Sequence, residues 1–329
     1  MSEQNNGAMQ AVAERQLDFK TSVQQDGFFQ EASVNSQLVY DVGAHQGEDT
    51  EFYLKKGFKV VAVEANPVLA EKLREKFWSN IVDGSLVVVS SAIAETAGEV
   101  SFYVNDHSEW GTLQPAFAER NASMGSPSKL IKVRAARFPE VLAAHGVPHY
   151  LKIDVEGSDV LCLEGLTETP VRPRYISIES EKRSWQSLLR EFELMKKLGY
   201  TKFKIVDQEE VYRQRPPHPA AEGRYVEHQF EPGSSGLFGQ ELPGKWLTMN
   251  QAIQRYRLIY LRYYFFGDFG ILRQALLRVP GFGKAASSNK SMTRTKPASA
   301  LRKMLNMLVK VRIFEILFKS HWYDTHATV

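Results

Sequence analysis

The chain is poor in cysteine and in long apolar runs. Its single cysteine, Cys162, excludes an internal disulfide and any cysteine-rich metal site, and we predict that it packs on a helix. The first residues lack the basic and apolar segments of a secretory signal. No window reaches the roughly 18 to 20 uninterrupted apolar residues of a membrane span. These absences predict a cytoplasmic protein.

Nucleic-acid-binding signatures are also lacking. No helix-turn-helix, RNA-recognition or zinc-finger pattern accompanies the basic residues, so we expect no nucleic-acid partner. The 329 residues are 43% hydrophobic and 24% charged, which is enough for a full core, and the length allows one large or two modest domains. The composition is that of a folded protein rather than a disordered one.

Charge is unevenly distributed along the chain. Residues 251–329 hold 14 Lys and Arg against three acids, a net charge of +11, whereas residues 1–250 carry −8. Within this basic part, a helical stripe is formed by Leu301, Met304, Leu305 and Leu308, with Arg302, Asn306 and Lys310 on another face. Such a helix can lie peripherally on the inner, anionic face of a membrane. Alternatively, it buries its stripe on its own protein or on a second subunit of a homo-oligomer.

The stretch 39–67, VYDVGAHQGEDTEFYLKKGFKVVAVEANP, predicts a β-α-β unit. Gly43 and Gly47 bracket its first turn, but the middle glycine of a dinucleotide-binding turn is missing, so no seat for a diphosphate is evident. Glu64, about 20 residues on, ends the second strand and can accept both hydroxyls of a ribose. The pattern suits S-adenosylmethionine and disfavours NAD.

Further apolar runs predict more strands. They are SLVVVSSAIAE, the strand-like EVSFYVN, HYLKIDVEG and RYISIE. In an open parallel sheet, ligands bind outside the carboxyl ends of the strands. We therefore expect five strand ends to converge on one crevice, at Gly43, Glu64, Ser91, Asp154 and Glu179.

Five segments form a recognisable set: DVGAHQGEDTEFYL, VEANP, EWGTL, LKIDVEGSDV and ISIES, which span roughly residues 37–207. Together they resemble the FkbM family of S-adenosylmethionine-dependent methyltransferases, and LKIDVEG is the most specific of them. The resemblance implies a class I methyltransferase fold, a Rossmann-like, doubly wound and mostly parallel α/β sheet. It also implies methyl transfer to a hydroxyl oxygen of a glycan, glycolipid or natural product.

The resemblance also implies a set of cofactor-binding residues. These are Asp41, Gly43, Ala44, Gly47, Glu64, Ala65, Ser91, Ala92 and Asp154. The first turn would line the methionine end of the cofactor, Glu64 the ribose, and Ser91 with Ala92 the adenine. Ser91 departs from the acid or amide that many class I enzymes have at this position.

An alkyl hydroxyl must lose its proton during transfer, which requires a base. Asp154 is the first candidate because it ends the fourth strand, and Glu156 and His107 follow. In the alternative interpretation, Asp154 caps a helix or orients the cofactor's amino group, Glu156 caps a helix, and His107 is a surface histidine.

Three residues are candidates for acceptor binding. Trp110 could stack on the face of a sugar, and Lys152 and Glu179 lie at strand ends of the same crevice. A buried ammonium is costly without a partner, so we predict that Lys152 pairs with Glu179 or with another carboxylate of the crevice. We predict no resident metal, although Asp154, Glu156 and Glu179 offer oxygen ligands of the kind that magnesium accepts.

The domain organisation follows from these segments. We expect an N-terminal tail or helix (1–36), a methyltransferase domain (37–210), a Pro/Gly-rich loop (211–245) and a basic helical extension (246–329). The loop contains five prolines and five glycines between residues 214 and 244. Irregular segments of this length are commonly lids or binding loops, and a passive linker is the alternative.

Two other functions are consistent with the same residues. A non-catalytic sensor or scaffold would bind the S-adenosyl ligand without turning it over. A NAD-dependent oxidoreductase is the second alternative, and the missing middle glycine argues against it.

Overall fold

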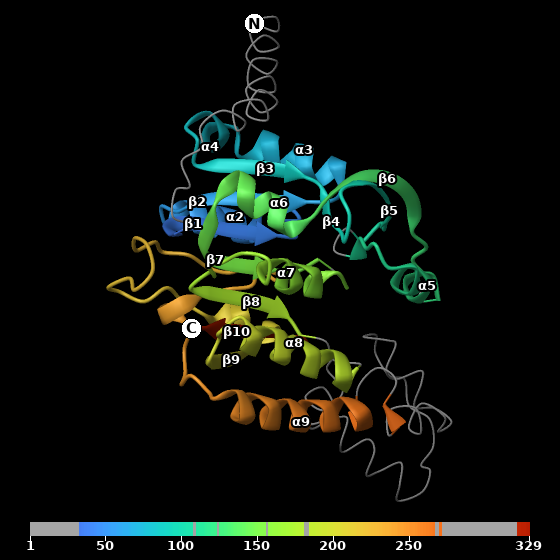
Figure 1. Ribbon diagram of the computed structural model, residues 1–329, viewed down its shortest axis with the longest axis vertical. Helices are drawn as coiled ribbons and strands as arrows, with labels where there is room; N and C mark the ends of the chain where they lie inside the picture. Colours follow the sequence, from blue (N-terminus) through green and yellow to red (C-terminus); the bar gives the residue numbers. More distant parts are fainter. Residues whose placement is uncertain are drawn as a thin grey trace, which may run out of the picture. The chain divides into compact units, whose positions relative to one another are not determined.

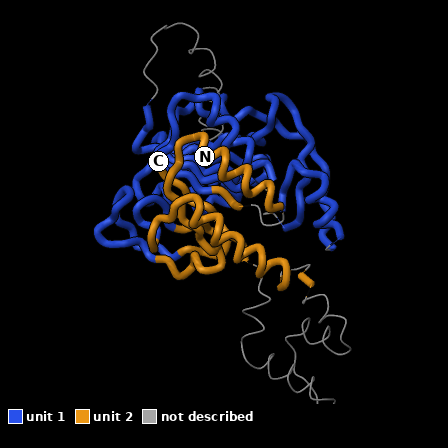
Figure 2. Tube along the Cα trace, turned by 60° about the horizontal axis from the view of Figure 1, so that its bottom comes forward, with its two compact units in different colours: residues 1–177, 215–229, 237–242 blue, residues 178–214, 230–236, 243–329 orange. Residues whose placement is uncertain are grey.

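A computed structural model describes residues 33–107, 110–123, 125–155, 157–180, 184–266, 270–271 and 321–329. Glu156, the N-terminal tail and the basic stripe at 301–310 lie outside the described residues. The chain divides into two compact units (Figure 2). Unit 1 comprises residues 1–177, 215–229 and 237–242, and unit 2 comprises residues 178–214, 230–236 and 243–329.

Unit 1 contains the parallel sheet that the sequence predicts (Figure 1). Its strands are β1 (Val34–Val42), β2 (Lys59–Glu64), β3 (Leu86–Ser90), β7 (Val147–Ile153) and the first part of β8 (Tyr175–Glu179), in the order β3-β2-β1-β7-β8. β1 pairs in parallel with both β2 and β7, and β2 with β3. Every residue of β7 is buried, as expected for a central strand covered on both faces.

Helices connect these parallel strands because a parallel pair requires a crossover. They are α2 (Glu48–Lys55), α3 (Pro67–Lys76), α4 (Trp78–Val82), α6 (Phe138–His145) and α7 (Asp159–Leu166). α3 illustrates the local cause: Asn66 caps it by accepting the Val68 N–H at 3.0 Å, and Pro67 stands at its first position. Phe52 and Tyr53 of α2 are fully buried against the sheet.

A second, smaller sheet follows β3. It consists of β4 (Ala92–Ile93), β6 (Lys129–Ala136) and β5 (Gly98–Val104), in that order, and α5 (Pro115–Ser123) lies between β5 and β6 in the chain. β5 is the predicted strand EVSFYVN. Ala92, Phe102 and Val133 form its apolar cluster, against which Ala65 packs.

The Pro/Gly-rich loop returns to unit 1 over residues 215–229 and 237–242. Lys56 and Glu241 form a fully buried ion pair at 2.9 Å, His149 bonds Glu222 at 2.8 Å, and the Phe238 ring stacks on Tyr150 with centroids 4.3 Å apart. Lys56 follows α2, and His149 is near the start of β7, so these contacts lie at the amino-terminal end of the strands. The predicted cofactor turn lies at the opposite, carboxyl end of the strands. These contacts therefore do not indicate a lid over that turn.

Unit 2 is built on β9 (Lys202–Asp207) and β10 (Tyr323–Thr328), which pair antiparallel, with α8 (Trp185–Lys197) and α9 (Met249–Phe266). The Phe192 ring of α8 contacts Phe203 and Tyr256, with centroids 5.3 and 5.9 Å away. The prediction of a helical extension over 246–329 is correct for α9 and wrong for its last residues. There, Thr and Tyr side chains suit a strand that pairs with β9.

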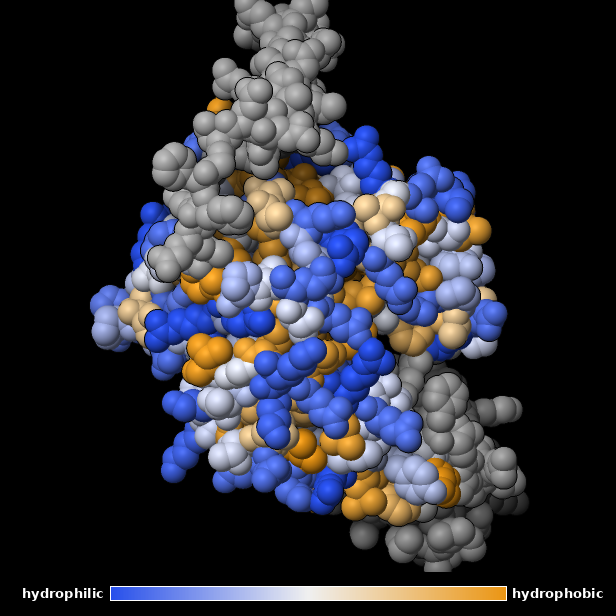
Figure 3. Space-filling model, viewed as in Figure 1, coloured by the Kyte–Doolittle hydropathy of each residue, from blue (hydrophilic) through white to orange (hydrophobic). Residues whose placement is uncertain are grey.

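The surface of the described chain mixes polar and apolar residues. Figure 3 shows one face, where hydrophilic residues separate small hydrophobic groups. Of the helices in the described ranges, none combines the length and the apolar character needed to cross a bilayer.

β1 begins at Val34, three residues before the predicted domain boundary.

Candidate functional site

The turn after β1, residues 43–47, is here called the cofactor turn. Gly43, His45 and Gly47 all have left-handed backbones, with φ of 87°, 50° and 80°. A Cβ at Gly43 would lie 1.7 Å from the carbonyl oxygen of Asp154, so only glycine lets the end of β1 approach the end of β7 this closely. The sequence-predicted pair Gly43 and Asp154 is thus brought together, and Ala44 is buried beside them.

Glu64 ties the end of β2 to the cofactor turn. Its Oε2 accepts the His45 N–H at 2.9 Å, and its Oε1 accepts the Asn66 N–H at 2.8 Å. Burial raises the pKa of Glu64, although both N–H groups oppose the shift. A carboxylate has about four lone-pair positions, so two remain for hydroxyl donors. The group can therefore hold a ribose while it holds the turn.

The predicted adenine residues lie next to Glu64. The Ser91 N–H donates to the Glu64 carbonyl at 3.0 Å, and the Ser91 hydroxyl donates to the Ala92 carbonyl at 3.2 Å. Ala65 and Ala92 belong to one apolar cluster. An apolar wall beside a buried acid is a suitable environment for an adenosine group.

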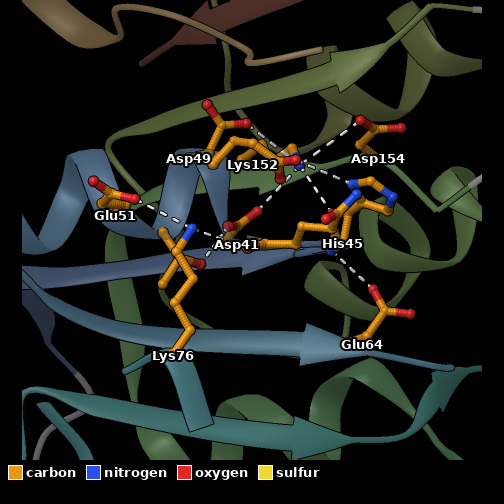
Figure 4. Close-up of polar contacts among 12 residues, drawn as sticks. Asp41, His45, Asp49, Glu51, Glu64, Lys76, Lys152 and Asp154 are labelled. Atoms are coloured by element: carbon orange, nitrogen blue, oxygen red, sulfur yellow. Dashed lines mark hydrogen bonds and ion pairs between the residues drawn. The ribbon is translucent and has the colours of Figure 1, made fainter. Parts of the chain in front are cut away.

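Lys152 lies at the centre of a group of three carboxylates (Figure 4). Its Nζ is 3.1 Å from Asp41 Oδ1, 3.6 Å from Asp49 Oδ2 and 3.7 Å from Asp154 Oδ2. We call these four residues the acidic cluster. Burial by itself lowers the pKa of Lys152, but the charges of Asp41, Asp154 and Asp49 outweigh it and raise the pKa well above the usual value. The prediction that Lys152 pairs with a crevice carboxylate is confirmed, and the partner is Asp41.

The acidic cluster reaches the cofactor turn through a hydrogen bond. Lys152 Nζ donates to the Gly43 carbonyl at 3.0 Å. With three carboxylates and one ammonium, the cluster carries a net charge of −2 when all are ionised. Negative charge at this place complements the sulfonium and the amino group of S-adenosylmethionine, so the residues present fit that cofactor.

Asp49 and Thr50 belong to the site, although no sequence motif indicated them. Thr50 donates its hydroxyl to Asp41 Oδ2 at 2.6 Å, and both residues are buried in the first turn of α2. An acid in a first helical turn is commonly a surface residue that interacts favourably with the positive end of the helix dipole. The only feature of the sequence that could have indicated them is their place in the first helical turn after the glycine-bracketed loop.

Asp154 is the accessible member of the acidic cluster. Its side chain is 40% exposed, whereas those of Asp41, Asp49 and Lys152 are at most 6% exposed. Its N–H donates to the Val42 carbonyl at 2.9 Å, which fixes the backbone at the end of β7. Asp154 can therefore meet a second substrate while its neighbours are out of solvent.

The segment from Asn105 to Phe117, which follows β5 and is here called the insert, lies against the loop that follows Asp154. Gln114 Nε2 donates to the Gly157 carbonyl at 3.4 Å, and a Cβ at Gly157 would meet the Phe117 ring at 2.6 Å. The Trp110 ring is half-buried beside His107, with centroids 4.7 Å apart. His107 is exposed, and its role as a base stays a prediction.

Other predicted residues lie elsewhere in the fold. Glu179 ends β8 in unit 2 and is half-buried, and its role in acceptor binding stays a prediction. Cys162 is buried in α7, as predicted. In the described part of the chain, His, Cys, Asp and Glu form no group that could hold a metal ion.

Parts of this chain are similar in sequence to known methyltransferases. The profile of the methyltransferase FkbM domain matches residues 41–202. A probable ribosomal RNA small subunit methyltransferase A of Methanospirillum hungatei is 36% identical over 56 residues, which are 17% of this chain and 22% of that protein. The match thus spans only about a fifth of that curated relative.

Two solved structures are similar at low identity. One is a precorrin-6y C5,15-methyltransferase of Geobacter metallireducens, at 12% identity, a TM-score of 0.31, and coverage of 53% of this chain and 69% of that one. The other is a methyltransferase of Thiobacillus denitrificans in complex with S-adenosyl-L-homocysteine, at 10% identity, a TM-score of 0.31, and coverage of 96% and 98%. The matched domain makes this chain a member of the S-adenosylmethionine-dependent FkbM methyltransferase family.

Proposed function

We propose that the chain transfers the methyl group of S-adenosylmethionine to a hydroxyl oxygen of a small acceptor, with Asp154 as the base. The observation that carries this proposal is the contrast within the acidic cluster. Asp154 alone is exposed at the rim, beside the cofactor turn, while Asp41, Asp49 and Lys152 are buried behind it. An exposed carboxylate at the end of a central strand is well placed to accept a proton.

The residues divide the work between binding and proton transfer. When bound, the cofactor supplies an electrophilic methyl group. The cofactor turn would hold the methionine end of the cofactor and Glu64 its ribose, and the acidic cluster would neutralise its positive charge. Correct placement of the acceptor contributes up to roughly 7–11 kcal/mol to such a reaction, and a positioned base about 10²- to 10⁴-fold. Orientation is therefore the larger effect.

The insert supports a sugar-containing acceptor, such as a glycan, a glycolipid or a glycosylated natural product. Trp110 is half-buried, and its backbone N–H donates to the His107 carbonyl at 2.9 Å, so the backbone that carries the ring is held in place. We expect Trp110→Ala to raise the KM for the acceptor about tenfold, because a stacked aromatic contributes roughly 1 kcal/mol or more, and to leave cofactor affinity unchanged. Steady-state kinetics with each substrate varied checks this.

Glu64 provides a direct test of the cofactor site. We expect Glu64→Ala to weaken binding of S-adenosylhomocysteine at least about 100-fold, since two hydrogen bonds to a charged group contribute about 1.5 kcal/mol or more each. Isothermal titration calorimetry measures this affinity. Glu71→Ala, an exposed acid on α3, is the matched control and should bind normally. Equal affinities for the two variants would contradict the role of Glu64.

An unbiased screen of candidate molecules can identify the acceptor. Purified protein is incubated with labelled S-adenosylmethionine and fractionated host glycans and lipids, and products that gain one CH₂ unit are found by mass spectrometry. A methyl group on oxygen supports the proposal. A methyl group found only on nitrogen or carbon, or no labelled product in any fraction, contradicts it.

A further inference from the structure

The loop between β7 and α7, residues 154–158, is held by a side chain that the mechanism has not used. Asp159, the first residue of α7, turns its carboxylate back toward this loop. Its Oδ1 accepts the Val155 N–H at 2.9 Å, and its Oδ2 accepts the Gly157 N–H at 3.1 Å. Both oxygens of one carboxylate thus fix two alternate peptide groups of the loop.

One of these peptide groups connects Asp159 with the catalytic end of β7. The peptide between Asp154 and Val155 directs its N–H to Asp159, and its carbonyl oxygen is the atom that a Cβ at Gly43 would meet at 1.7 Å. A rotation of this peptide would move the Asp154 backbone and disturb its close approach to the cofactor turn. Asp159 is therefore connected with both parts of the site through this one peptide group.

We propose that Asp159 is a positioning residue that fixes Asp154, and the loop after it, in the orientation needed for proton transfer. This inference rests on the function proposed above for Asp154. It explains why an acid stands in a half-buried place at the start of α7, where a serine or asparagine could also begin the helix.

The protonation state of Asp159 matters for this role. Burial raises the pKa of Asp159 to about 6, the Val155 N–H opposes the shift, and the charge of Asp154 adds to it. The titratable group that acts on it is Asp154, itself paired with Lys152. Burial, and then the charge of Asp159, raise the pKa of the Cys162 thiol on α7. A protonated carboxyl offers one good acceptor instead of two. The hold on the loop therefore weakens as the pH falls through about 6.

Asp159→Asn imitates the protonated state, because the amide keeps one acceptor oxygen and replaces the other by a donor. We expect kcat for methyl transfer to fall about tenfold at pH about 8, the effect of one lost hydrogen bond to a charged group. The decline of wild-type kcat near pH 6 should disappear in the variant. Thermal stability should be equal or higher at pH about 8, since the raised pKa of Asp159 means that folding disfavours its ionised form.

Asp83→Asn is the matched control for this variant. Asp83 is exposed and accepts the Ser85 N–H at 2.8 Å, so the same substitution removes the same kind of loop contact away from the site. It should leave kcat and its pH profile unchanged. Wild-type kcat and an unchanged decline near pH 6 in Asp159→Asn would overturn the proposal.

Amide hydrogen exchange tests the loop without any acceptor. In the cofactor-free protein, the protection factors of the Val155 and Gly157 amides should be high at pH about 8, lower at pH about 5, and low at both in Asp159→Asn. Protection that is the same in both proteins would overturn the role of Asp159, whatever the chemistry of the enzyme. If the two amides lose protection in Asp159→Asn as expected, but the wild type methylates no hydroxyl, the proposed function is refuted and the loop assignment is intact.

Discussion

Replacing Lys152 by methionine is expected to lower the free energy of unfolding by about 3–5 kcal/mol at neutral pH, the usual cost of removing one partner of a buried ion pair. The reason is the environment of the aspartates that remain. The Asp41 side chain is fully buried and that of Asp49 is 4% exposed, so both would lose their counter-charge away from water. Chemical denaturation followed by circular dichroism measures the change.

The pH dependence of this effect has a definite sign. The folded protein raises the pKa of Lys152 above its usual value. A cation with a raised pKa contributes stability that is fully present below its unfolded pKa, about 10.4, and is lost as the pH rises through the folded pKa. The difference between wild type and Lys152→Met should therefore be constant from about pH 7 to 10 and shrink only at higher pH.

Two further variants separate the ion pair from general damage. Lys55→Met removes an exposed ion pair, in which the Lys55 side chain is 47% and the Glu51 side chain 35% exposed. It should lower the free energy of unfolding by less than about 1 kcal/mol. Adding Asp41→Asn to Lys152→Met should restore part of the lost stability, because one uncompensated charge disappears. If Lys152→Met and Lys55→Met are equally stable, the acidic cluster is not an important source of stability.

The sequence was sufficient for the parts of the site that are built locally. Gly43, Gly47 and Glu64 belong to one β-α-β unit, where strand, turn and helix follow each other within about 30 residues. The need of Lys152 for an acidic partner could be predicted from burial alone. The identity of that partner could not be predicted, because Asp41 and Lys152 are brought together only by the pairing of β1 with β7.

Non-local contacts explain what was missed. β10 pairs with β9 across about 120 residues of chain. The six residues of β10 lack the apolar alternation that predicts a strand. Likewise, the Pro/Gly-rich loop has the composition of a lid, but Lys56 with Glu241 and His149 with Glu222 attach it at the other end of the sheet. Composition identified an irregular segment and could not give its place.

Asp159 was missed for a different reason. In the run IDVEGSDV it reads as an ordinary acid at the start of a helix, where a carboxylate favours the free N–H groups. Its carboxylate instead binds N–H groups of the preceding loop. Only the loop conformation, with Gly157 at φ 93°, directs those groups toward it.

Replacing Asp154 by asparagine is expected to lower kcat about 10²- to 10⁴-fold, the contribution of a positioned general base. Asparagine keeps the shape of the side chain but cannot take the proton of the acceptor hydroxyl. Since Asp154 is 40% exposed and 3.7 Å from Lys152, the fold should tolerate the change. Radiometric methyl transfer gives kcat, and calorimetry with S-adenosylhomocysteine gives the affinity of the cofactor site.

The two measurements distinguish the two roles that Asp154 can have. A base predicts a large loss of kcat with cofactor affinity within a few-fold of wild type, whereas a residue that only orients the cofactor predicts a loss of affinity with kcat retained at saturation. An acceptor with a more acidic hydroxyl should also recover part of the lost rate, because it needs the base less. Asp83→Asn should match wild type in every assay. Full activity of Asp154→Asn on all acceptors would move the proton transfer to another group, and His107 would then be the described residue to test next.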